Sequence, residues 1–160
     1  MAGPVLGKYS LFVAIILWGI LLGGIVYAHI VYFPPYLSDL PDSAVIVTGK
    51  YGLNEAKFWM ILHPLTILFL TVSLVLNWRV KARRSSILAS MGIYFIVLAA
   101  TTLFFLPELN AFRESANSNI SPAEWLARGN RWQYLSWVRG AVMFAGFLPL
   151  LSALTKREIM

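Results

Sequence analysis

The sequence contains no cysteine and few charged residues. Without cysteine the chain forms no disulfide, thiolate nucleophile, iron–sulfur cluster or thiolate metal site, so metal chemistry would need His, Met or carboxylate ligands. Charged residues make up 12% of the 160 residues and hydrophobic residues 59%, whereas soluble domains are about a quarter charged. The composition therefore indicates a protein whose solvent is lipid.

Four apolar stretches run over about residues 9–33, 58–78, 87–106 and 132–154. Each reaches the ~20 residues that a helix needs to cross ~30 Å of hydrocarbon. The alternating pattern of membrane strands is absent, and open strands cannot satisfy their backbone groups in lipid. We therefore predict an all-α fold, a four-transmembrane-helix bundle that forms a single integral membrane domain over residues 1–160.

The basic residues are distributed unequally between the loops, and this distribution predicts the orientation of the chain in the membrane. Lys8, the segment 79–84 and the pair Lys156 and Arg157 flank helix ends that share one side of the membrane. The positive-inside rule makes that side cytoplasmic. The net charge of +6 then reflects topology, and we expect no nucleic-acid partner. We predict that both termini are cytoplasmic and that the protein resides in the bacterial inner (plasma) membrane.

The two outer loops, residues 34–57 and 107–131, are long, and we expect them to cap the bundle. In the second of them Ser121, Pro122 and Glu124 form a helix-start signal, with a capping residue, a proline at the first helical position and an acid at the third. This signal predicts a short helix over residues 122–128 that lies on the membrane surface and ends at Gly129 and Asn130.

Three polar side chains fall inside the predicted spans at similar depth. His29 and His63 lie about one turn from the outer ends of the first two spans, and Arg139 about two turns into the fourth. Polar groups in lipid are costly, so each is a candidate site residue. We expect these side chains, with Glu108 at the rim, to face one cavity in the outer leaflet half. The alternative is structural: the histidines are hydrogen-bonded core residues and Arg139 reaches toward the headgroups.

The second half of the chain has an ordered set of short motifs. A span ending in Thr101-Thr102-Leu103-Phe104-Phe105-Leu106-Pro107 is followed by Glu108-Leu109-Asn110, then by Trp132 and by Trp137-Val138-Arg139. This order resembles the anthrone oxygenase-like family of small four-helix membrane proteins, and Pro107, Asn110, Trp132 and Arg139 match its pattern. The resemblance implies oxidation of a hydrophobic aromatic substrate by dioxygen. The two histidines are not part of the match.

One class of function is therefore a membrane oxidoreductase with its site in the outer leaflet half. In a cofactor-free form His63 or His29 removes an acidic C–H proton and Arg139 stabilises the oxyanion. In a haem form His29 and His63 are axial ligands of haem b, while Arg139 or Arg131 pairs with the propionates. Glu108, Asn110 and Trp132 complete the predicted cofactor-binding set.

The other class is non-catalytic. A small bundle without cysteine also suits a subunit of a larger membrane complex or a lipid-binding membrane protein. The partners that we expect are membrane lipid, a hydrophobic small-molecule substrate, and a second copy of the chain or a larger complex.

Overall fold

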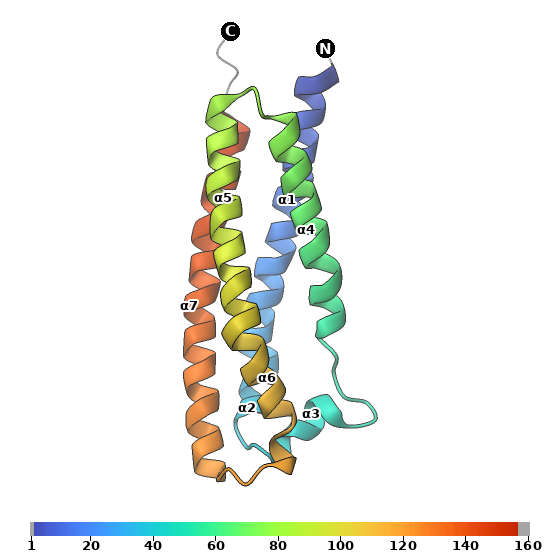
Figure 1. Ribbon diagram of the computed structural model, residues 1–160. Coiled ribbons are helices and arrows are strands. Elements are labelled where there is room, and N and C mark those ends of the chain that lie inside the picture. Colours follow the sequence, from blue (N-terminus) through green and yellow to red (C-terminus); the bar gives the residue numbers. More distant parts are fainter. Residues whose placement is uncertain (1, 157–160) are drawn as a thin grey trace.

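The computed structural model describes residues 2–156, with side chains from residue 5 onward. Within these residues the chain is helical and contains no strand. Four helical rods are long and apolar enough to cross a membrane: Val5–Leu37, Ala56–Leu76, Lys81–Arg113 and Pro122–Thr155. The rods run side by side, and the first and last described residues lie at the same end (Figure 1). The predicted all-α bundle of four membrane-length helices is confirmed.

Two rods are uninterrupted α-helices and two contain a π-helical turn. The second and fourth rods are α4 (Ala56–Leu76) and α7 (Pro122–Thr155). The first rod consists of α1 (Ala2–Tyr27), the π turn η1 (Ala28–Tyr32) and α2 (Phe33–Leu37). The third consists of α5 (Lys81–Ala100), the π turn η3 (Thr101–Phe105) and α6 (Leu106–Arg113).

Prolines follow both π turns. Phe33 separates η1 from Pro34 and Pro35, and Leu106 separates η3 from Pro107, so each proline stands in the first turn of the helix that follows. A proline inside a helix removes one backbone donor and its ring collides with the carbonyl four residues earlier. A π turn holds an extra residue, which widens the helix at that point and lets it continue through the proline. The predicted helix ends at residues 33 and 106 were therefore wrong, because both helices run on past their prolines.

The loop predicted over residues 107–131 is mostly helix. Only residues 114–121 connect α6 to α7, and they include the 3₁₀ turn η4 (Ser115–Asn117). The predicted start signal is confirmed, since the Ser121 hydroxyl accepts a hydrogen bond from the Glu124 N–H at 3.3 Å. The predicted stop at Gly129 is wrong. A Cβ at Gly129 would lie 3.3 Å from the Leu37 carbonyl oxygen, so this glycine allows α2 and α7 to approach closely instead of ending the helix.

The connection from α2 to α4 covers residues 38–55 and contains two short helical elements, the 3₁₀ turn η2 (Asp42–Ala44) and α3 (Val45–Thr48). The Ser43 hydroxyl donates to the Tyr36 carbonyl at 2.7 Å, which fixes η2 against α2. The Leu53 N–H donates to the Ile46 carbonyl at 2.8 Å. This connection is therefore hydrogen-bonded to itself and to the end of the first rod.

The bundle is built from two close helix pairs. The pairs are α1 with α4 and α5 with α7, and α1 joins them by its contact with α7, whereas α4 and α5 touch much less. Trp18, Tyr94 and Met143 lie in the apolar core of the half nearer the chain ends. A second core, which includes Phe33 and Trp132, fills the other half.

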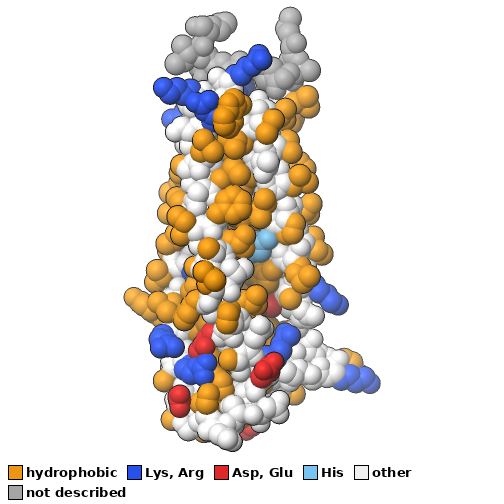
Figure 2. Space-filling model, in the orientation of Figure 1, with side chains coloured by type: hydrophobic (Ala, Val, Ile, Leu, Met, Phe, Trp, Pro, Cys, Tyr) orange, Lys and Arg blue, Asp and Glu red, His pale blue; other side chains and the backbone are white. Residues whose placement is uncertain are grey.

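Charge is distributed unequally between the two ends. At the end that holds residues 2 and 156, cations gather above a band of hydrophobic side chains, and both signs occur at the opposite end (Figure 2). Arg83, which is 2% exposed, donates to the Lys156 carbonyl at 3.0 Å and to the Asn77 side-chain oxygen at 3.2 Å. Asn77 in turn donates to the Gly7 carbonyl at 2.9 Å. These bonds tie all four rods together at this end.

A substitution at Gly146 would test how closely the helices pack. A Cβ at this position would lie 2.6 Å from Cγ2 of Ile93 on α5 and 3.3 Å from Trp18 on α1, whereas a Cβ at Gly92 would meet nothing within 4 Å. Overpacking a tight contact costs about 1 to 3 kcal/mol. We expect Gly146→Ala to lower the free energy of unfolding by that amount, and Gly92→Ala to leave it unchanged or raise it. Denaturation in detergent micelles measures both, and equal values for the two variants would contradict the packing.

Candidate functional site

Arg139 on α7 extends into the bundle beside the π turn η3. Its guanidinium donates to the Thr101 hydroxyl at 3.1 Å and to the Ser136 hydroxyl at 2.8 Å. The guanidinium carbon lies 4.2 Å from the centre of the Phe105 ring. Among the described residues no carboxylate comes within ion-pair distance of Arg139. Its charge is therefore held by two neutral hydroxyls and one aromatic face.

Glu108 does not join this arrangement. Its two carboxylate oxygens accept from Nε and Nη2 of Arg128 at 2.8 and 2.7 Å, and the Arg128 guanidinium also covers the Trp125 ring at 4.5 Å. This two-pronged ion pair joins α6 to the first turns of α7. The expectation that Glu108 faces one cavity with Arg139 was therefore wrong, because a nearer arginine on α7 takes the carboxylate.

His29 lies in the π turn η1 and is 3% exposed. Its Nδ1 is 2.7 Å from the Ile25 carbonyl, and since a carbonyl only accepts, Nδ1 carries the proton. Nε2 is buried without a hydrogen-bond partner. Aromatic rings surround the imidazole, with centroids 4.6 Å away at Trp137, 5.3 Å at Phe33 and 6.4 Å at Trp132. This histidine is locked in place and closed off from small molecules.

His63 joins α4 to α5, two neighbouring helices that touch less than the two close pairs do. Its Nδ1 lies 2.6 Å from the hydroxyl of Tyr94 on α5, and its ring stacks on Trp59 with centroids 5.9 Å apart. Unlike His29, it is only partly buried. His63 therefore links α4 to α5 through one polar contact.

A cavity of about 360 Å³ opens near these residues, between the end of the first rod and the start of α4. Its only carboxyl is Glu55, whose Oε2 accepts from the Trp59 indole N–H at 3.2 Å. Gly24 shapes one wall, because a Cβ there would lie 2.6 Å from the Phe58 ring. The cavity is mainly aromatic and apolar; its lining residues are Gly24, Tyr27, Ala28, Val31, Tyr32, Leu53, Asn54, Glu55, Phe58 and Trp59.

Glu55 lies just before the membrane-spanning part of α4. Burial raises the pKa of its carboxyl above the ordinary value of 4.5, while the Trp59 hydrogen bond and the charges of Arg139 and Arg113 act in the opposite direction. The charge of Arg139 also acts on His29 and His63. Arg139 is therefore the electrostatic link between the cavity carboxyl and the two imidazoles.

Glu55 was not predicted as a site residue from the sequence. The signal was present, because an acid directly precedes an apolar span and stands four residues before Trp59, on the same helix face. Asp and Glu at the start of a helix are common, however, since they complement its dipole. Only the cavity distinguishes Glu55 from such a residue.

The other predicted site residues lie around this region and not in the cavity. Trp132 is buried, and its indole N–H donates to the Phe105 carbonyl at 3.0 Å, so it holds α7 against η3. Asn110 and Arg131 are exposed at the bundle end. The wall of the cavity includes none of His29, His63 and Arg139.

The residues present do not form a haem site. The space beside His29 is filled by aromatic rings, and Nδ1 of His63 is bonded to Tyr94. Over the described part of the chain no group of three or more His, Cys, Asp or Glu side chains is placed to hold a metal ion. Binding of haem b stays a prediction from the sequence alone.

Comparison of the chain with family models, with curated proteins and with solved structures gave no match. A function for the chain therefore has to be inferred from the geometry of the cavity and of the Arg139 cluster.

The raised pKa of Glu55 predicts a stability change with pH. The unfolded chain ionises Glu55 near 4.5, but the folded protein resists ionisation, so the wild type loses stability as the pH rises from there through the raised pKa. Glu55→Gln keeps an acceptor for Trp59 and never ionises. We expect its melting temperature to match the wild type at pH 4 and to exceed it at pH 8. Glu114→Gln, at an exposed position, is the control, and a wild type with the lower melting temperature at pH 4 only would contradict the assignment.

Proposed function

We propose that this protein is a membrane oxidoreductase of the oxygenase type, which takes a hydrophobic aromatic molecule into the Glu55 cavity. The observation that carries the proposal is the cavity of about 360 Å³ with aromatic walls and one carboxyl, whose pKa is raised by burial. Apolar pockets with a few convergent polar groups are typical ligand sites, and a raised carboxyl pKa suits a general base. The resemblance to the anthrone oxygenase-like family supports the same substrate class.

The proposed chemistry needs no bound cofactor. The Glu55 carboxylate removes a proton from an acidic CH₂ group of the substrate, and the resulting carbanion spreads its charge onto a ring oxygen. Arg139, whose charge acts on Glu55, stabilises this anion electrostatically. Dioxygen is the oxidant: the CH₂ carbon becomes C=O with one oxygen atom, and the second oxygen leaves as water with both hydrogens. Glu55 returns its proton to that water.

Glu55 suits the role of the base better than either histidine. His29 is enclosed by aromatic rings, and Trp59 stands between the cavity, which it lines, and His63, on which it stacks. We assign His63 and Tyr94 to positioning Trp59, because their hydrogen bond fixes the imidazole against which the indole rests. Arg139 acts through its charge and not by contact with the cavity.

We further propose that both termini are cytoplasmic, which places the cavity in the outer leaflet half of a bacterial inner membrane. The support is the charge distribution. The end that holds residues 2 and 156 carries Lys8, Arg79, Lys81 and Arg84, whereas every acidic residue of the described chain lies toward the opposite end.

Oxygen consumption with anthrone as the probe tests the function. We expect wild-type protein in nanodiscs to consume dioxygen and form the quinone, and Glu55→Gln to lose about 10²-fold or more of the rate while still quenching tryptophan fluorescence on binding. Gly24→Ala should weaken binding, because the added Cβ pushes Phe58 toward the cavity, while Gly23→Ala, whose Cβ would meet nothing within 4 Å, should not.

An unchanged rate in Glu55→Gln would reject the proposed base. Saturable binding without oxygen uptake in the wild type would reject the enzyme and leave the non-catalytic alternative, a lipid-binding protein or a subunit of a larger membrane complex.

A further inference from the structure

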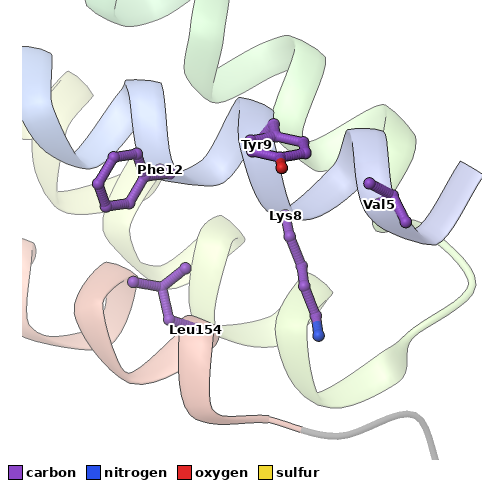
Figure 3. A pocket seen from close by; sticks show the side chains of 5 residues that line it. All are labelled: Val5, Lys8, Tyr9, Phe12 and Leu154. Carbon is purple, nitrogen blue, oxygen red and sulfur yellow. The ribbon is translucent and has the colours of Figure 1, made fainter.

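A second cavity lies at the other end of the molecule. It has a volume of about 380 Å³ and lies between the start of α1 and the end of α7. Figure 3 shows Phe12 of α1 and Leu154 of α7 on one side, with Val5 and the Lys8 amine nearer the end of the bundle. Tyr9 completes the lining. The groove is thus apolar along most of its length and carries one cation, Lys8, toward the end of the bundle.

Lys8 has no partner of its own among residues 5–156. No hydrogen bond or ion pair involves its amine within that range, and it is exposed. The cations Arg79, Lys81 and Lys156 belong to the same end, and the described carboxylates all lie toward the other one. An anion that approaches this groove therefore meets an excess of positive charge with no described carboxylate to compete.

We propose that this groove binds an anionic phospholipid, with one acyl chain along Phe12 and Leu154 and the phosphate at Lys8. The two halves of the groove fit the two halves of such a lipid, since its chain needs an apolar surface inside the bilayer and its headgroup a cation at the surface. A free phosphate would contact the Lys8 amine but would leave the apolar part of the groove unoccupied.

A second copy of the chain is a poorer occupant of the groove. Docking of two copies through this face about a two-fold axis along the membrane normal would bring the two basic ends side by side. The like charges at Lys8 and its neighbours would then oppose the contact. The lipid meets the same surface with charge of the opposite sign.

Lipid selectivity of the full-length protein tests the proposal. Spin-labelled phosphatidylglycerol and phosphatidylcholine are compared in nanodiscs that contain both lipids. We expect the wild type to prefer phosphatidylglycerol and Lys8→Gln to lose about fivefold of that preference, the usual contribution of one basic residue near a membrane surface. Lys57→Gln, at the other end of the bundle, should keep the wild-type preference.

A second pair of variants tests the apolar part of the groove. Leu154→Trp should fill the groove and reduce retention of both lipids, while Leu148→Trp, at an exposed position of α7 outside the cavity, should not. Equal preference in the wild type and Lys8→Gln would overturn the proposal. Displacement of phosphatidylglycerol by inorganic phosphate at equal concentration would also overturn it, because the groove would then recognise a free anion. Neither readout depends on oxidation at the Glu55 cavity.

Discussion

The structure of the half of the bundle that is remote from the chain ends depends on one constraint. That constraint is the charged guanidinium of Arg139, which lies among apolar helices. An arginine at the centre of a bilayer costs about 2.5 to 3.5 kcal/mol, and less toward the interface. Arg139 offsets this with the hydroxyls of Thr101 and Ser136 and with the face of Phe105. Two of these partners, Thr101 and Phe105, belong to the π turn η3. The widened turn and the half-buried charge are therefore parts of one arrangement.

The chemistry that we propose for the cavity depends on the same charge. Arg139 acts on Glu55 and on both imidazoles through its charge alone, because its hydrogen bonds go to Thr101 and Ser136. The only strong ion pair near it, between Glu108 and Arg128, lies at the bundle end of the described chain. In the proposed reaction, the substrate anion would meet the positive field of Arg139 and a carboxyl whose pKa is raised by burial. Arg83 shows the contrasting use of an arginine, since its bonds to Lys156 and Asn77 close the other end of the bundle.

The sequence predicted the number and type of the helices because lipid imposes a length and a composition that four stretches satisfy. The ends of the first and third helices were mispredicted because a proline normally terminates a helix. The residues before Pro34 and Pro107 carry no sequence signal that predicts a π turn. Gly129 was predicted to end a helix because glycine is common at helix C-termini. In the structure its missing side chain instead allows α7 to approach Leu37 closely. His29, His63 and Arg139 were placed at similar depth by counting turns. The hydrogen-bond partners of these three residues, and the cavity that Glu55 lines, arise from packing between different helices. The sequence of one helix does not show this packing.

Thr101 holds the charge of Arg139 inside the bundle, and a comparison of Thr101→Val with Thr102→Val tests this role directly. Both hydroxyls donate to carbonyls of their own helix, at Val97 for Thr101 and at Leu98 and Ala99 for Thr102, but only Thr101 accepts from Arg139. The free energy of unfolding in micelles should fall by about 1.5 to 3 kcal/mol more for Thr101→Val, the usual value of a hydrogen bond to a charged group. Equal losses in the two variants would contradict the account.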